Sequence, residues 1–493
     1  TTVTHLSLRY YRQPLQAGHI PMSVTQLKLD NFDQLLQTEH IPQSVTNLYL
    51  GHFNQPLHAG HIPQSVKHLY LGHFNQLLQA GHIPMSVTQL KLVEFDQPLH
   101  AGHIPQSVTH LYLGRFNQPL QAGHIPMSVI QLTLVDFDQP LHTGHIPQSV
   151  THLSLWHFDQ PLQAGHIPTS VTQLTLENFD QPLQDGYLPH SVKQLSLVCY
   201  NQPLQAGHIP LSVAQLTMDN FDQPLQDGHI PQSVTQLSLE RFNQPLQDGH
   251  ISPSVVDLSL ECFNQLLHVG NIHSHSAMRL SFGRLFNQYL SIEHIPSATS
   301  LSIQNSQFSP ENFGLHCHSR LDTITIVHEL QGQGSSSFLD FNCDSLLMRN
   351  LSHLIVQIKT ESAHMPKKIS DGAPHSLLRL LKSIPTITLQ FFNGSFDIDF
   401  ETIWRHLDGR TALFVSVTKA DGDGIVSFWN FPTLPNDSNN SSTPDQLRLR
   451  EFLEQKTIVQ MSRFTKDKLR QYLSVMGVST NNTPMTNLNM AKA

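Results

Sequence analysis

The feature that most constrains this chain is an internal repeat of 21 residues. Leucine recurs at this spacing from Leu6 to Leu258, which gives thirteen units in strict register, and Leu280 and Leu301 continue the pattern after a one-residue slip. Self-similarity at a short fixed period is typical of repeat architectures, in which each unit buries its apolar side chains against its neighbours. The sequence therefore predicts about 15 stacked coils.

One unit, residues 108–128, shows what a coil can form. It reads VTHLYLGRFNQPLQAGHIPMS, and Leu111 and Leu113 flank Tyr112 in the two-residue alternation of a short strand. The leucines are expected to point into the body and the tyrosine out of it. The other interior side chains of the unit are those of Phe116, Leu120 and Ile125. This small number of apolar side chains cannot form a core within one coil. Neighbouring coils must therefore cover them.

The rest of the unit is predicted to be a return segment without a helix. Pro119 and Pro126 both oppose a helical backbone, because proline lacks the amide hydrogen that a helix needs. Gly123 lies in a column that is glycine in nearly every unit, with Glu39 as an exception, as expected where a tight turn requires a positive φ.

Stacking such coils predicts a parallel β ladder with the return segments on the opposite face. The predicted fold is therefore a repeat solenoid, leucine-rich-repeat-like, of the α/β class but mostly β with irregular returns. A three-sided β-helix is the alternative, although the single two-residue alternation in each unit speaks against it.

The same residues resemble the FNIP repeat family, which is related to leucine-rich repeats. The resemblance is carried by Phe116-Asn117 followed by Ile125-Pro126, within the recurring segments FNQPL, GHIP and SVTHLYL, and it covers residues 1–305. It implies a solenoid interaction module without catalysis, in a family where some members carry an F-box or a protein kinase domain before the repeats.

Beyond the array the sequence predicts four further parts. Residues 306–433 are predicted to form longer, degenerate coils that cap the solenoid, an independent α/β domain being the alternative; 434–443 is a polar linker, 444–477 a helical segment and 478–493 a disordered tail. Strand-like segments within the cap lie at 324–326, 354–358, 387–389 and 414–417.

The outward positions of the predicted strands vary from unit to unit and are candidates for a binding surface. Tyrosine, tryptophan and arginine dominate the energetics of many interfaces, and lysine between tyrosines permits cation–π contact. The binding residues predicted on this concave face are Lys28, Tyr49, Tyr70, Lys91, Tyr112, Arg115, Trp156 and His157.

A histidine column that includes His61, His82 and His124 is the most conspicuous repeated feature. Stacked imidazoles can bind divalent metals, but one line of ligands does not surround an ion, so packing and hydrogen bonding at the return turn is the preferred interpretation. The constant glutamine and Asn/Asp columns are interpreted as amide ladders. No catalytic, metal-site or cofactor motif occurs, so we expect no enzyme activity and no cofactor.

Charge and composition limit the partners. The formal net charge is −9 and no dense Lys/Arg cluster occurs, so nucleic acid is not an expected partner. No uninterrupted apolar run approaches the roughly 18 residues that cross a bilayer, so a membrane is not expected either. Cys199 and Cys262, three coils apart in one column, are expected to be too distant for a disulfide, which favours a reducing compartment, the cytoplasm.

Three functions are compatible with these observations. The first is a non-enzymatic scaffold that docks a protein partner on its concave face. The second is the recognition arm of an F-box ubiquitin ligase or of a kinase whose other domain lies upstream of Thr1. The third is a secreted glycan- or metal-binding solenoid.

Overall fold

The computed structural model describes most of the repeat array and parts of the C-terminal region. The described residues are 3–272, 274–304, 313–314, 321–330, 353–360, 386–393, 398–408, 411–418, 424–430 and 461–464. The chain divides into two compact units, Thr1–Leu260 (unit 1) and Glu261–Ala493 (unit 2), and each is described by itself.

Unit 1 contains one short strand in each of its coils. The strands are β1 (His5–Leu8), β2 (Gln26–Leu29), β3 (Asn47–Leu50), β4 (His68–Leu71), β5 (Gln89–Leu92), β6 (His110–Leu113), β7 (Gln131–Leu134), β8 (His152–Leu155), β9 (Gln173–Leu176), β10 (Gln194–Leu197), β11 (Gln215–Thr217), β12 (Gln236–Ser238) and β13 (Asp257–Leu260). Each pairs in parallel with the next, and paired residues are 21 positions apart, as Leu27 with Leu48. The predicted parallel ladder is confirmed.

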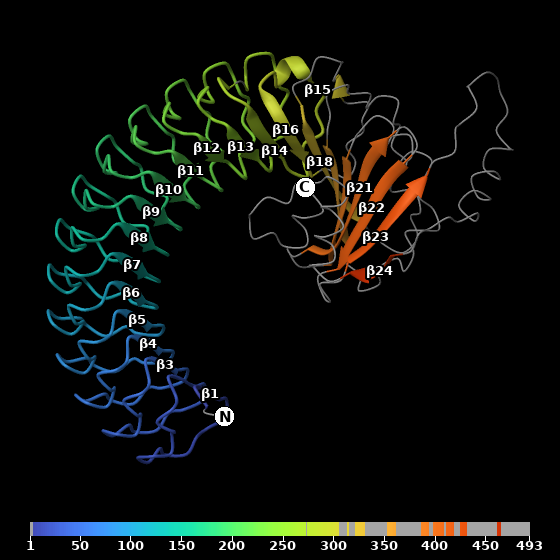
Figure 1. Cartoon of the computed structure of the whole chain (residues 1–493). Coiled ribbons are helices and arrows are strands. Elements are labelled where there is room, and N and C mark those ends of the chain that lie inside the picture. The colour runs from blue at the N-terminus through green and yellow to red at the C-terminus, as the bar shows by residue number, and fades with distance from the viewer. Residues whose placement is uncertain are drawn as a thin grey trace, which may run out of the picture. The chain divides into compact units, whose positions relative to one another are not determined.

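The strands of unit 1 lie along the inner side of a curved array, and the connecting segments loop around its outer side (Figure 1). We call these two sides the strand face and the return face. The connecting segments of the described coils contain turns and bends but no second strand, so the alternative of a three-sided β-helix is wrong for unit 1. The coils are those of a leucine-rich-repeat-like solenoid.

The core of unit 1 is made of the same columns in every coil. In the coil of β6, Leu111, Leu113, Phe116, Leu120 and Ile125 are each at most 2% exposed. The phenylalanine rings stack along the array, with centroids 6.3 Å apart between Phe95 and Phe116 and 6.2 Å between Phe116 and Phe137. Burial is therefore completed between coils and not within one coil, as the sparse apolar pattern requires.

The return turns depend on a left-handed backbone position. Glycine occupies it in nearly every coil of unit 1 with φ between 80° and 93°, for example 87° at Gly123, whereas Glu39 adopts φ 71° there. A side chain with a Cβ is strained in this conformation, by about 1–2 kcal/mol. The predicted role of the glycine column is confirmed, and Glu39 is the strained exception.

Replacing Glu39 with glycine is expected to stabilise unit 1 by about 0.5–1 kcal/mol, because relief of the strain exceeds the conformational entropy that glycine adds to the unfolded chain. Urea unfolding followed by circular dichroism measures this. Gly123→Ala is the matched control: a Cβ there would lie 4.0 Å from that of Ala101, so only φ opposes it, and stability should fall by about 1 kcal/mol. A loss of stability in Glu39→Gly would contradict the assignment.

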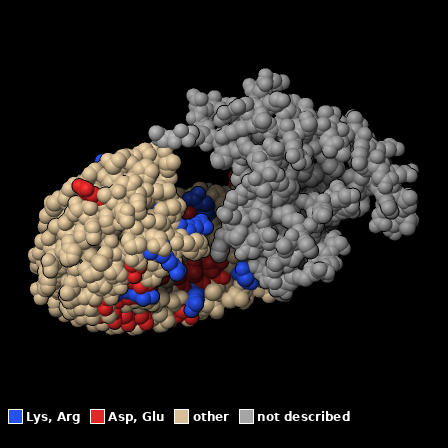
Figure 2. Space-filling view, turned by 90° about the horizontal axis from the view of Figure 1, so that it is seen from below, with Lys and Arg blue, Asp and Glu red and all other residues tan. Residues whose placement is uncertain are grey.

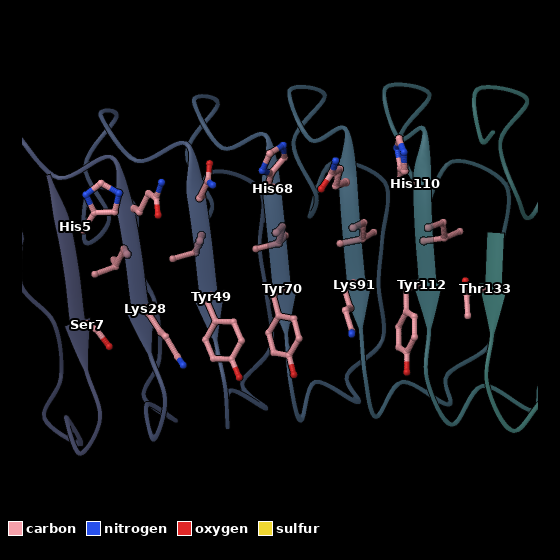
Figure 3. A pocket seen from close by; sticks show the side chains of 18 of the residues that line it. His5, Ser7, Lys28, Tyr49, His68, Tyr70, Lys91, His110, Tyr112 and Thr133 are labelled. Carbon is pink, nitrogen blue, oxygen red and sulfur yellow. The ribbon is translucent and has the colours of Figure 1, made fainter. Parts of the chain in front are cut away.

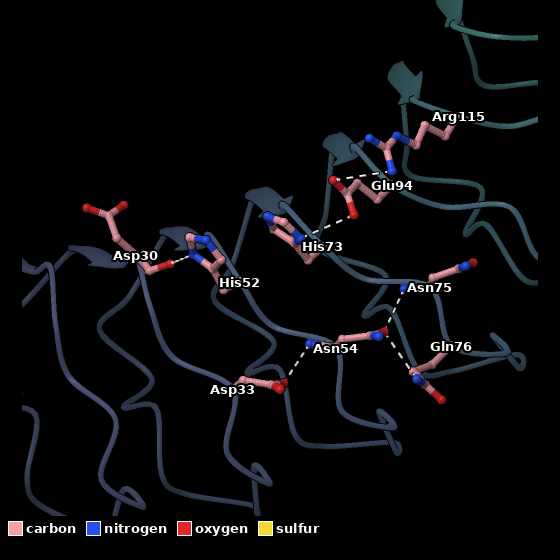
Figure 4. Close-up of polar contacts among 9 residues, drawn as sticks. All are labelled: Asp30, Asp33, His52, Asn54, His73, Asn75, Gln76, Glu94 and Arg115. Carbon is pink, nitrogen blue, oxygen red and sulfur yellow. Dashed lines mark hydrogen bonds and ion pairs between the residues drawn. The ribbon is translucent and has the colours of Figure 1, made fainter.

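The Asn/Asp column forms a hydrogen-bonded ladder along unit 1 (Figure 4). The Oδ1 atom of Asn54 accepts hydrogen bonds from the backbone amide of Asn75 at 2.8 Å and from Nε2 of Gln76 at 3.1 Å. Asp33 accepts the equivalent bond from the amide of Asn54 at 2.9 Å. The column satisfies backbone donors of the neighbouring coil, which confirms the predicted amide ladder and leaves it without need of a ligand.

Unit 2 continues with strands that become antiparallel. Its elements are β14 (Met278–Phe282), β15 (Leu290–Ser291), the 3-10 helix η1 (Ile292–His294), β16 (Ala298–Ile303), β17 (Phe313–Gly314), β18 (Thr323–Leu330), β19 (His353–Thr360), β20 (Thr386–Asn393), β21 (Ile398–Asp408), β22 (Thr411–Thr418), β23 (Gly424–Asn430) and β24 (Met461–Phe464). β14, β16, β18, β19 and β20 pair in parallel in that order, whereas β20 to β24 pair antiparallel.

These strands partly correct the predicted cap. The segments predicted at 324–326, 354–358, 387–389 and 414–417 lie in β18, β19, β20 and β22. β18, β19 and β20 continue the parallel pairing that coils would give, whereas β20 to β23 pair antiparallel, so the interpretation as degenerate coils is wrong for β21 to β23.

The predicted C-terminal parts are described only in β24. Met461–Phe464 form this strand within the segment predicted to be helical, 444–477. The remainder of that segment, the linker 434–443 and the tail 478–493 lie outside the described residues. Within the described part of the chain, no helix has the length and apolar character to cross a membrane.

Candidate functional site

A groove on the strand face runs across β1 to β7 and contains five of the eight predicted binding residues (Figure 3). Its volume is about 710 Å³. Lys28, Tyr49, Tyr70, Lys91 and Tyr112 come from the middle positions of consecutive strands and lie in one row. We call this row the Tyr/Lys row.

The Tyr/Lys row is a continuous stack. Tyr49 and Tyr70 have ring centroids 4.0 Å apart and planes inclined by 11°. The Nζ atom of Lys28 lies 4.7 Å from the Tyr49 ring centroid, and that of Lys91 lies 5.7 Å from Tyr70 and 4.2 Å from Tyr112. These distances are within the range of cation–π contacts.

A glycine lies next to each tyrosine of the Tyr/Lys row on the same face of the strand. Side chains two positions apart in a strand share a face, and each tyrosine of the row is followed two positions later by Gly51, Gly72 or Gly114. A Cβ on Gly72 would lie 1.9 Å from the carbonyl oxygen of Gly51, so the neighbouring coil approaches too closely for any larger residue. The tyrosines are thus flanked by backbone on this side.

The groove is lined by donors and cations and contains no carboxylate. Besides the Tyr/Lys row it includes His5, His68 and His110, with Gln26, Asn47, Gln89 and Gln131. Burial is the main cause that raises the pKa of Tyr70, to about 12, and that of Tyr112. Both hydroxyls therefore remain protonated donors at neutral pH.

The flanking His, Gln and Asn positions of the groove were missed in the sequence analysis. They precede the Tyr/Lys row by two residues in each strand, and the two-residue alternation that placed Tyr112 outward also places His110 outward. The signal was available, but these positions were overlooked because amides and imidazoles are less typical of interface hot spots than tyrosine.

A second row of charged side chains lies beyond the ends of the strands (Figure 4). His52 and His73 stack with ring centroids 4.5 Å apart. Nδ1 of His73 lies 3.2 Å from a carboxylate oxygen of Glu94, and Nη1 of Arg115 lies 3.7 Å from the other. We call the row that contains these four residues the His/Glu row.

Two predicted binding residues belong to this second row and one stands between the rows. Arg115 pairs with Glu94, and His157 lies 2.7 Å from Asp136. Trp156, 40% exposed, directs its indole N–H to Oγ of Ser154 at 2.8 Å. Five of the eight predicted residues therefore form one compact row, and the structure does not bring the other three into it.

The histidine column lies at the return turns. The backbone amide of Gln121 donates to Nδ1 of His124 at 3.2 Å, and the amide of His124 donates back to the carbonyl of Gln121 at 3.1 Å. Because Nδ1 accepts, the proton of the neutral ring is on Nε2, which leaves that nitrogen without a lone pair for a metal. The predicted hydrogen bonding of this column at the return turn is confirmed.

A second set of histidines occurs in every second coil, next to the first column. The ring of His58 lies 5.0 Å from that of His61 and 5.9 Å from that of His82, both edge-on, and the arrangement recurs at His100 and His142. Among the residues that the structure describes, no three His, Cys, Asp or Glu side chains are arranged to hold a metal ion. The recurrence at every second coil reflects a 42-residue pairing of units.

Charged side chains are concentrated on part of the described surface. Figure 2 shows acidic and basic groups close together there, while much of the surface in that view carries neither. Cys199 is a half-buried free thiol. The side chains that vary most from coil to coil are those of the Tyr/Lys and His/Glu rows. They supply stacked rings, ammonium groups and hydrogen-bond donors.

Comparisons with known proteins support the repeat assignment. The profile of the FNIP Repeat family matches residues 10–53, 53–92, 74–115, 116–156, 158–199 and 200–241. No curated protein matches the chain.

Two solved structures are similar. The crystal structure of CroV588, described as a novel circular LRR protein, has a TM-score of 0.63 and 27% sequence identity over 79% of this chain, which spans 56% of that protein. The functional domain of InlJ from Listeria monocytogenes, described as including a cysteine ladder, has a TM-score of 0.33 and 10% identity over 75% of this chain and 86% of that one. The first similarity agrees with the leucine-rich-repeat-like coils.

Proposed function

We propose that this chain, in which residues 10–241 match FNIP repeats and the coils are leucine-rich-repeat-like, is a non-enzymatic scaffold that binds a protein partner on the strand face of unit 1. The observation that carries the proposal is the Tyr/Lys row. Three tyrosines and two lysines are aligned there along a groove of about 710 Å³, on consecutive strands of a parallel ladder.

The residue types of the groove suit a protein interface. Tyrosine supplies a large contact area with few rotatable bonds, and it is enriched among the residues that contribute most to binding energy. Stacking orders the rings of Tyr49 and Tyr70 before any partner arrives, so less conformational entropy is lost on binding. The constant columns, in contrast, are occupied by core packing and amide ladders.

The proposal includes a cytoplasmic location and excludes catalysis from the role of the repeats. The free thiol of Cys199 is compatible with a reducing compartment. Where each coil repeats the side chains of its neighbour, a unique set of catalytic groups has little opportunity to form. The recognition-arm function is a special case of the same proposal, since it uses the same face.

The test compares partner capture by two variants of the full chain. The strand-face variant carries alanine at Tyr49, Tyr70, Tyr112 and Trp156. The matched return-face variant carries alanine at four exposed apolar residues outside the strands, Met22, Leu77, Met85 and Met127, whose exposed fractions are 62–69%. After chemical cross-linking in native lysate, we expect partners of the wild-type chain to be lost at least about tenfold from the first variant and retained by the second.

Both variants must melt within a few degrees of the wild type for the comparison to count. Capture that is retained by the strand-face variant and lost by the return-face variant would place the interaction on the opposite side of the solenoid and refute the proposal.

A further inference from the structure

We propose that the occupant of the groove is an extended, acidic polypeptide segment of a partner protein, lying across β2 to β6 with carboxylates at Lys28 and Lys91. This inference rests on the proposed function and adds the chemistry of the partner.

The stacking decides which parts of the tyrosines can meet a ligand. One face of the Tyr49 ring is covered by the Lys28 ammonium and the other by Tyr70, while Lys91 is seated between Tyr70 and Tyr112. Ring faces are therefore largely unavailable for stacking on a ligand. The three tyrosines are half-buried and line the groove, so the ring edges and hydroxyls are the parts left to meet a ligand, and aromatic edges carry partial positive charge.

The Tyr/Lys row presents cations and hydrogen-bond donors, and it presents no anionic group of its own. The two ammonium groups are cationic, and the phenol hydroxyls of Tyr49 and Tyr112 are able to donate hydrogen bonds to a ligand, whereas that of Tyr70 is hydrogen-bonded to Tyr49. No Asp or Glu side chain lines the groove, although the whole chain has a formal charge of −9. Lys28 is paired with Asp30 at 3.2 Å, whereas Lys91 has no ion pair within the described residues.

The neighbouring surfaces restrict the position of an anionic segment. On one side, the surface that contains the His/Glu row has four carboxylates, those of Asp33, Glu94, Asp96 and Asp136, against the single guanidinium of Arg115, so its net charge disfavours an anionic segment. On the other side lie Asn47, His68 and Gln89, whose amides and imidazole can hydrogen-bond to a peptide backbone. An acidic peptide is therefore favoured in the groove and disfavoured beside it.

The spacing fits an extended peptide. Adjacent parallel strands are about 4.8 Å apart, so Lys28 on β2 and Lys91 on β5 are separated by roughly 14 Å. Side chains four residues apart in an extended chain point the same way and are separated by roughly 13 Å. The partner segment should consequently carry two acidic residues four positions apart.

The probe is a fluorescein-labelled dodecapeptide with two glutamates four residues apart and Ser, Thr and Val elsewhere, compared with the same peptide carrying glutamine at both positions. Fluorescence anisotropy with the full chain measures Kd. We expect the Glu peptide to bind at least about tenfold more tightly than the Gln peptide, with a difference that shrinks at high salt.

Two variants with the same charge change separate the groove from the general surface. Lys91→Gln should weaken binding of the Glu peptide about tenfold. Lys193→Gln, an exposed lysine of unit 1 outside the groove, should change Kd less than about twofold. Unchanged circular dichroism melts would show that both variants fold.

Equal affinities for the two peptides, or equal effects of the two substitutions, would overturn the inference. Tighter binding of a heparin oligosaccharide than of the Glu peptide would overturn it in favour of a sulfated glycan. Failure here is distinguishable from failure of the proposed function: a partner that is lost from the strand-face variant while the Glu peptide does not bind would keep the scaffold proposal and refute the acidic segment.

Discussion

Phe116→Ala is expected to lower the free energy of unfolding of the solenoid by about 3–5 kcal/mol, the usual cost of truncating a fully buried phenylalanine. The Phe116 ring is 0% exposed and stacks between Phe95 and Phe137, so the cavity lies at two interfaces between coils. Stability in such an array is a sum of contributions within coils and between neighbours. A defect in the middle should therefore weaken the coupling between the two halves.

Guanidinium unfolding monitored by circular dichroism measures both effects. The midpoint should fall, and the transition should broaden or divide as the two flanking segments unfold separately. Tyr200→Phe is the matched control, because it restores the residue of the other coils at a fully buried position and removes only a hydroxyl; its stability should change by less than about 1 kcal/mol. A Phe116→Ala transition as sharp as that of the wild type, at the same midpoint, would contradict coupling through the phenylalanine stack.

Acidification is expected to destabilise the solenoid below about pH 6.5. Burial at the return turns is the largest cause that lowers the pKa of ten histidines below 6.5, and the neighbouring rings add to it in most of them: His61, His82, His103, His124, His145, His166, His208, His229, His250 and His294. The unfolded chain then binds more protons than the folded one as the pH falls through this range. Stability is thus fully present above pH 6.5 and is lost progressively below it.

The Tm at pH 5 should be lower than that at pH 7.5 by on the order of 5–10 °C, measured by calorimetry at constant ionic strength. Asp219 opposes the trend as a single group, because burial and then the charge of Glu240 raise its pKa to about 6, so that its carboxyl takes up a proton more readily in the folded state. A Tm that does not change over this range would refute the prediction.

The chain itself supplies the control for the pH experiment. Asn271 occupies the histidine position in its coil, and its Oδ1 accepts the amide of His268 at 2.7 Å, as Nδ1 of histidine does elsewhere. Asparagine therefore preserves the hydrogen bond without a titrating ring. Replacing His82, His103, His124 and His145 together with asparagine should flatten the pH dependence in proportion to the sites removed.

The sequence was sufficient to predict unit 1 because its interactions are repeated at one spacing. Once the period of 21 is known, Leu111 must lie beside its equivalents in the next coils, and the columns predict both the core and the amide ladder. The same reasoning placed Tyr49 beside Tyr70 and Lys91 beside Tyr112. The stacking itself could be anticipated from residue type and register.

Prediction failed where the period or the strand ends. Arg115 and His157 come after their strands in a left-handed conformation, with φ of 53° and 62°, so the two-residue alternation no longer indicates where their side chains lie. In unit 2 the pairing changes from parallel to antiparallel between β20 and β21. This change depends on the length of short connections, and the 21-residue repeat does not extend to them. Local irregularity removed the basis of the inference in both places.

The pairing of coils seen in the alternating histidines has a consequence for how such a chain can change over time. Gain or loss of two coils preserves the contact of His58 with His61 and His82 and its recurrence at His100, whereas gain or loss of one coil disrupts the alternation. Unequal recombination in steps of two can therefore lengthen or shorten the array without any new folding problem. The number of coils that follow the Tyr/Lys row can then change by selection while the groove itself stays the same.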